Sequence, residues 1–61
     1  MKGSELLRRV TKKGWYFVRH GSQHDLYGHD DYPGVLVSIP RHKSKEVPKG
    51  TAENILKVTG S

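Results

Sequence analysis

The chain has 61 residues, of which 33% are hydrophobic, and it contains no cysteine. This length allows one domain, spanning residues 1–61, with a small core that neither disulfides nor thiolate metal sites can supplement. No apolar run approaches membrane-spanning length, and the charged N-terminus does not resemble a secretion signal. We therefore expect a cytoplasmic protein that does not act at a membrane.

The positive charge is dense for so short a chain. Lys and Arg number 11 against 6 Asp and Glu, for a formal net charge of +5. Nucleic acid is the commonest partner of such a field. An acidic protein partner, or charge that only maintains solubility, would explain the composition too, because charge alone does not choose among them.

The first predicted element is a helix over residues 4–13. Leu6 and Val10 repeat at helical spacing. Ser4 is a candidate N-cap, since its hydroxyl can accept a backbone N–H of the first turn. Gly14 is a natural residue to end the helix.

Three strands are predicted next. Residues 15–20 are aromatic and β-branched, and residues 24–29 follow a turn at residues 21–22. Residues 33–34 are Pro-Gly, which fits a type II turn. Alternating apolar residues then predict a third strand over residues 35–39. Such short turns favour an antiparallel meander.

A basic segment, residues 40–50, separates the strands from a final helix. Thr51 is the expected N-cap, and Gly60 ends the helix. The apolar stripe of this helix consists of Ala52, Ile55, Leu56 and Thr59. The order α-β-β-β-α predicts an α+β fold, with two helices covering one face of a three-stranded antiparallel sheet. The double-stranded-RNA-binding domain has the same order.

Alternation along the first strand predicts that Trp15 and Phe17 face the core. His20, His29 and His42 are expected in solvent. A zinc site built from histidines is disfavoured, because no helical His-x-x-x-His pair and no cysteine are present.

Several short motifs occur in a characteristic order along the whole chain. They are Ser4-Glu5-Leu6, Gly14-Trp15, Gly21-Ser22-Gln23-His24, Pro40-Arg41-His42, Gly50-Thr51 and Ile55-Leu56-Lys57. In these motifs and their spacing the chain resembles the HicA toxins, small ribonucleases of bacterial toxin–antitoxin pairs. The resemblance implies a fold like that of the double-stranded-RNA-binding domain and a growth-arresting endoribonuclease that cleaves mRNA. It also implies neutralisation by a HicB-like antitoxin.

The resemblance further implies that His24, the histidine of Gly-Ser-x-His, is the catalytic residue. Many relatives have a second histidine or an asparagine where this chain has Gln23. RNA carries its own nucleophile in the 2′-OH, so one proton-transferring imidazole can serve without a metal or cofactor. Histidine suits this task, because its unperturbed pKa of about 6.5 lies near working pH.

Candidate RNA-binding residues lie around the turn, in the basic segment and on the first helix. The backbone at Gly21 and Ser22 can approach a phosphate closely. Arg41 and Lys43 are the closest candidates for the charge-stabilising cation, and Arg41 is favoured provided that the strand register brings it near His24. Other candidates are Lys45, Lys49, Arg8, Arg9 and Lys12. Phosphate contacts predict steep salt dependence, and this fold would read duplex RNA mainly by shape.

Two other classes of function fit the sequence. The first is an RNA-binding module without catalysis, for which the basic charge and the fold suffice. The second is a protein-interaction domain with an acidic partner, which would not retain RNA even at low salt.

Overall fold

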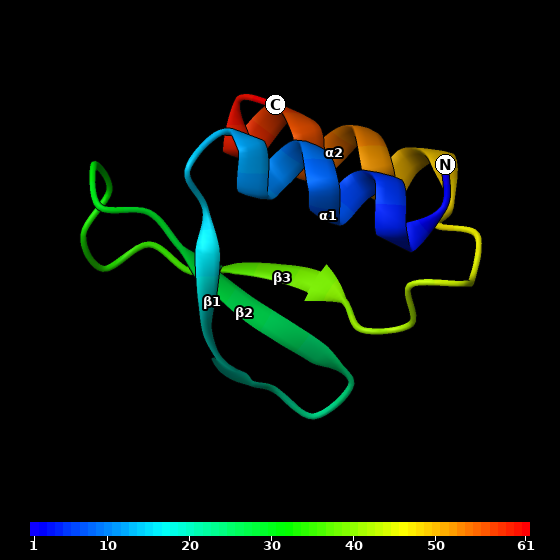
Figure 1. Ribbon diagram of the computed structural model, residues 1–61, viewed down its shortest axis with the longest axis horizontal. Helices are drawn as coiled ribbons and strands as arrows, with labels where there is room; N and C mark the ends of the chain where they lie inside the picture. The colour runs from blue at the N-terminus through cyan, green and yellow to red at the C-terminus, as the bar shows by residue number, and fades with distance from the viewer.

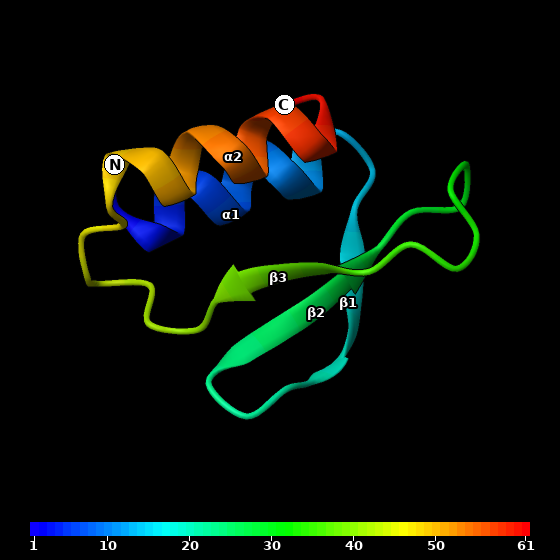
Figure 2. The same ribbon diagram turned by 180° about the vertical axis from the view of Figure 1, so that it is seen from behind.

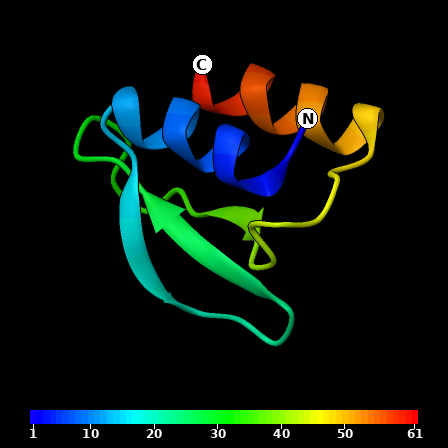
Figure 3. The same cartoon turned by 45° about the vertical axis from the view of Figure 1, so that its right-hand side comes forward.

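The computed structural model describes residues 1–61, and its elements follow the predicted order. They are α1 (Gly3–Lys12), β1 (Tyr16–His20), β2 (His24–Gly28), β3 (Val37–Pro40) and α2 (Lys49–Thr59). The two helices lie side by side over one face of the sheet (Figure 1). The reverse view and the oblique view show the same two layers (Figures 2 and 3). The α+β architecture, similar to the double-stranded-RNA-binding domain, is therefore confirmed.

The sheet is an antiparallel meander with strand order β1-β2-β3. The pairing of β1 with β2 shifts register between Phe17 and Arg19. In the pairing of β2 with β3, His24 lies opposite Pro40. The first residue of β2 is therefore next to the last residue of β3.

The register also assigns side chains to the two faces of the sheet. Ile39 is 1% exposed and belongs to the core beneath the helices. Its partner across the strands is Asp25, and directly paired residues point to the same face. Asp25 therefore points to the helix-covered side, whereas His24 and Pro40 point to the open side.

The core is built from both helices, the central sheet and the segments that join them. Its nine buried members are Leu6, Val10, Trp15, Tyr27, Val37, Ile39, Val47, Ala52 and Ile55. Trp15 also donates a buried hydrogen bond from Nε1 to the carbonyl of Thr59, at 3.0 Å. This bond joins the start of the sheet to the end of α2.

The start of α1 differs from the prediction. The helix begins at Gly3, and the side chain of Ser4 caps nothing. The amide groups of Gly3 and Ser4 instead donate to the carbonyls of Lys45 and Lys43, at 3.0 and 2.9 Å. Backbone carbonyls of the basic loop (residues 41–48) thus accept hydrogen bonds from the free N–H groups of the first helical turn. A side-chain cap is therefore unnecessary.

The start of α2 and of β3 also differ by about two residues from the prediction. α2 begins at Lys49, so Thr51 lies inside the helix and is not its cap. β3 begins at Val37, because residues 35–36 belong to the loop that follows the predicted type II turn. In that turn Gly34 has φ +84°, and the amide of Val35 donates to the carbonyl of Tyr32 at 3.1 Å.

Phe17 does not join the core as predicted, because the residue is 47% exposed. The register shift beside Phe17 interrupts the simple alternation of β1. All five residues of β1 are exposed. The prediction was correct for Trp15, which is 3% exposed.

His29 is also not in solvent as predicted, because its side chain is only 15% exposed. The ring packs edge-on against Trp15, with ring centroids 5.2 Å apart. Its Nε2 lies 2.8 Å from the carbonyl of Lys13, and its Nδ1 accepts the amide of Asp31 at 3.0 Å. These contacts attach the end of β2 to the junction between α1 and β1.

Candidate active site

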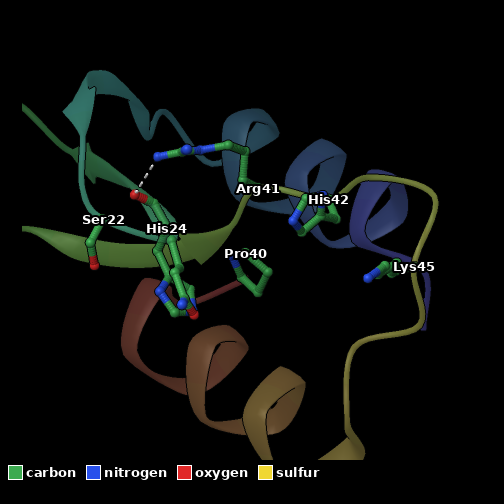
Figure 4. A pocket seen from close by; sticks show the side chains of 7 residues that line it. Ser22, His24, Pro40, Arg41, His42 and Lys45 are labelled. Carbon is green, nitrogen blue, oxygen red and sulfur yellow. Dashed lines mark hydrogen bonds between the residues drawn. The ribbon is translucent and has the colours of Figure 1, made fainter.

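A hollow of about 490 Å³ opens where β2 begins and β3 ends. Its lining is polar and basic apart from one proline, and consists of Ser22, Gln23, His24, Pro40, Arg41, His42 and Lys45. The turn between β1 and β2 supplies one wall, and the end of β3 with the basic loop supplies the other (Figure 4). Such a hollow suits an anionic, hydrated ligand.

His24 is exposed within this hollow. It is the first residue of β2, and its position in the register directs it to the face that the helices leave open. The rings of His20 and His29 hydrogen-bond within the chain, whereas that of His24 makes no such bond. Its imidazole is therefore free to exchange a proton with a bound molecule.

The turn before His24 is tightly closed. The amide of Gly21 donates to the carbonyl of His24 at 2.6 Å. A Cβ at position 21 would lie only 2.7 Å from that carbonyl oxygen, so only glycine fits without displacement. Gly21 therefore permits close approach of the chain to itself, and its close approach to a phosphate stays a prediction.

The register brings Arg41 to the same turn. Its Nη2 donates to the carbonyl of Gly21 at 2.7 Å and contacts the carbonyl of His24 at 3.4 Å. Its Nε donates to Oδ1 of Asp25 at 3.1 Å. The strand register therefore brings Arg41 near His24, as its expected role required. Two of its three guanidinium nitrogens, Nε and Nη2, already have acceptors within the chain.

Asp25 is the centre of a small charged network. Its Oδ1 lies 2.8 Å from Nδ1 of His20 in addition to the contact with Arg41. The hydrogen bond from His20 is the largest effect and lowers the pKa of Asp25, burial opposes it, and the hydrogen bond from Arg41 lowers the pKa further, so that the net shift is downward. Asp25 therefore remains a carboxylate in moderately acidic solution.

Of the other predicted RNA-binding residues, only Ser22 and Lys45 also line the hollow with His24. Gly21 adjoins it in the turn. Lys43 is exposed in the basic loop, outside the lining. Lys49 opens α2, where its Nζ lies 4.0 Å from Glu53, and it lines a separate hollow.

The three cations of α1 do not join the site. Arg9 forms an ion pair with Glu5 at 3.3 Å, and with Lys12 it lines a hollow near the end of α1. Arg8 lines another hollow on that helix with Glu5. The predicted RNA-binding set is thus distributed over several surfaces.

Three residues of the hollow were not predicted as binding residues, namely Gln23, Pro40 and His42. Their neighbours in the motifs Gly-Ser-Gln-His and Pro-Arg-His were the available signal. The sequence offered Asp25 as a residue that could orient a neighbouring histidine, and the structure pairs it with His20, because a tight hairpin turn places the residues that flank it opposite each other.

Residues 3–60 match the family model described as HicA toxin of bacterial toxin-antitoxin. This range includes all five elements of the fold. The chain belongs to the HicA toxin family. The resemblance inferred from the motifs is thereby confirmed, and a HicA toxin is one member of a toxin–antitoxin pair. A search of curated proteins finds no significant match. Neither helix has the length and hydrophobicity that a membrane-spanning helix requires.

Proposed function

We propose that this HicA toxin is an endoribonuclease that cleaves mRNA in the cytoplasm and arrests growth, with His24 as its catalytic residue. The main support is the exposed imidazole of His24 in a hollow that also presents Arg41, His42 and Lys45. A proton-transferring group next to cations is what cleavage of a phosphodiester requires.

The reaction would use the 2′-OH of the RNA as nucleophile. His24 accepts the 2′-OH proton while the 2′-oxygen forms a bond to phosphorus. The bond from phosphorus to the 5′-oxygen breaks, and that oxygen takes a proton from a water molecule, while the protonated His24 returns its proton to solvent. The products are a 2′,3′-cyclic phosphate and a 5′-OH end. One positioned general acid–base contributes roughly 10²–10⁴-fold to such a reaction.

Substrate binding would depend on charge rather than on base recognition. Lys45 and Ser22 line the hollow, and their side chains form no ion pair or hydrogen bond with a carboxylate. They would contact phosphate oxygens. The cations of α1 would contact phosphates farther along the RNA. A HicB-like antitoxin with an acidic surface would neutralise the toxin by covering the hollow, since such a surface complements the net charge of +5.

Induced expression of the wild type and of His24→Ala tests this proposal. The wild type should arrest growth and shorten mRNA half-lives, with cyclic phosphate ends at the cut sites, and co-expression of the cognate HicB should restore growth. His24→Ala should neither arrest growth nor shorten mRNA half-lives, although it should accumulate as a folded protein. If the variant is equally toxic, His24 is not catalytic.

The alternative is an RNA-binding module without catalysis. It has support from the cations that lie away from the hollow, Arg8, Arg9 and Lys12. RNA that is retained by the purified wild type but never cut would favour this alternative.

A further inference from the structure

We infer that Arg41 and Asp25 are positioning residues that hold the backbone of His24, so that Arg41 serves the site chiefly by orienting it. This inference rests on the proposed catalytic role of His24. We call Arg41, Asp25 and the turn carbonyl of Gly21 the Arg41 clamp.

The clamp closes the turn from a neighbouring strand. Arg41 follows the last residue of β3, yet its Nη2 reaches across to the carbonyls of Gly21 and His24, at 2.7 and 3.4 Å. The carbonyl of His24 also accepts the amide of Gly21, at 2.6 Å. Two donors on one carbonyl, one from the turn and one from the residue that follows β3, restrict the peptide bond between His24 and Asp25.

Asp25 fixes the guanidinium that makes these bonds. Its side chain is 18% exposed, and its Oδ1 accepts from Nε of Arg41 at 3.1 Å. The guanidinium is planar and rigid, so anchoring Nε to a carboxylate sets the direction of Nη2. A lysine at position 41 would keep the charge but not this fork. His20, 2.8 Å from the same oxygen, holds the carboxylate from β1.

The guanidinium of Arg41 and the imidazole of His24 point in different directions, although both residues line the hollow. Asp25 shares the helix-covered face with Ile39, whereas His24 points to the open face with Pro40. Figure 4 shows the side chains of Arg41 and His24 leaving in different directions, joined only through the His24 carbonyl. The clamp therefore acts on the backbone of His24 and leaves its ring free for the substrate. A shift of about 1 Å in a catalytic group can cost about 10²-fold in rate.

Single-turnover cleavage of a defined RNA by purified Arg41→Lys and Asp25→Asn tests the inference. Both variants should cleave at least tenfold more slowly at saturating protein, with RNA affinity within about threefold of the wild type. Lys45→Gln, a cation of the hollow outside the clamp, should instead weaken binding. Thermal unfolding of each variant would show that the protein remains folded.

A second measurement does not depend on cleavage. The Nε–H signal of Arg41 in an NMR spectrum should exchange slowly in the wild type and become fast in Asp25→Asn, with a shifted His24 amide. If the wild type cuts no RNA, the proposed function fails, and the clamp is judged by these signals alone. Wild-type rates in both variants overturn the inference. So does an Arg41→Lys variant that loses only affinity, because Arg41 would then be a phosphate ligand.

Discussion

Gly3 of α1 packs directly on the carbonyl of His42, and a Cβ at position 3 would lie 2.7 Å from that oxygen. The same Cβ would lie 3.1 Å from Cα of Lys43. The backbone of the basic loop thus lies against the start of α1, where it also accepts the amide of Ser4. The loop that presents Lys45 to the hollow is therefore held in place by a helix that itself contributes no residue to the hollow.

Gly3→Ala should displace the basic loop. Alanine favours a helix over glycine by roughly 0.5–1 kcal/mol, but here the added carbon meets backbone that cannot move aside alone. We expect weaker RNA binding and a lower urea midpoint for this variant. Gly50→Ala is the matched control, because a Cβ there meets nothing within 4 Å and Gly50 lies in α2. It should gain stability and keep wild-type binding. Equal gains in both variants would contradict this account of the loop.

His29→Ala should destabilise the fold without altering the site. The ring packs on Trp15 and bonds to the carbonyl of Lys13, so its removal leaves a gap beside Trp15 and breaks this hydrogen bond. We expect a loss of about 1–3 kcal/mol in the free energy of unfolding. At a temperature where the variant is folded, its cleavage rate should equal that of the wild type. A wild-type unfolding midpoint would show that these contacts contribute little.

Asp25 makes the stability of the protein depend on pH. Its pKa is lowered in the folded state, chiefly by His20 and then by Arg41. A group with a lowered folded pKa stabilises the protein above its unfolded pKa, and this contribution is lost as the pH falls through the folded value. The gap in urea midpoint between the wild type and Asp25→Asn should therefore narrow from pH 6 to pH 3. A gap that stays constant over that range would mean that the carboxylate is not stabilised in this way.

Lys45→Gln should reduce the salt dependence of RNA binding. Each phosphate contact contributes about −0.7 to the slope of log K against log salt for a single strand. We expect the slope to fall by about that amount, because Lys45 lines the hollow. Lys57→Gln is the control, since Lys57 is an exposed cation in the last turn of α2, outside the hollow. Matching slopes in the two variants would indicate that the hollow does not bind phosphate.

The boundaries of the elements could be predicted where local chemistry decides them. Gly14, Gly34 and Gly60 all have positive φ, at 98°, 84° and 72°. A residue of this type was expected at each place, because left-handed conformations favour glycine. The buried stripe of α2 was also predicted from spacing alone, including Thr59, whose hydroxyl donates to the carbonyl of Ile55.

The predictions from sequence were wrong where contacts with distant parts of the chain determine the local structure. The start of α1 is satisfied by the carbonyls of Lys43 and Lys45, some forty residues away in the sequence, so no local cap was required. The exposure of Phe17 follows from a register shift in β1, and no glycine next to it in the sequence indicates such a shift. The Arg41 clamp depends on which residue of β3 lies opposite His24, and a sequence alone does not specify that pairing.

The most direct test of the account is the single-turnover cleavage rate of His24→Ala beside that of the wild type. Each protein should be in saturating excess over the same RNA substrate, and circular dichroism should show that both are folded. We predict a loss of at least about 100-fold, with RNA retention unchanged. Equal rates for the two proteins would contradict a catalytic role for His24.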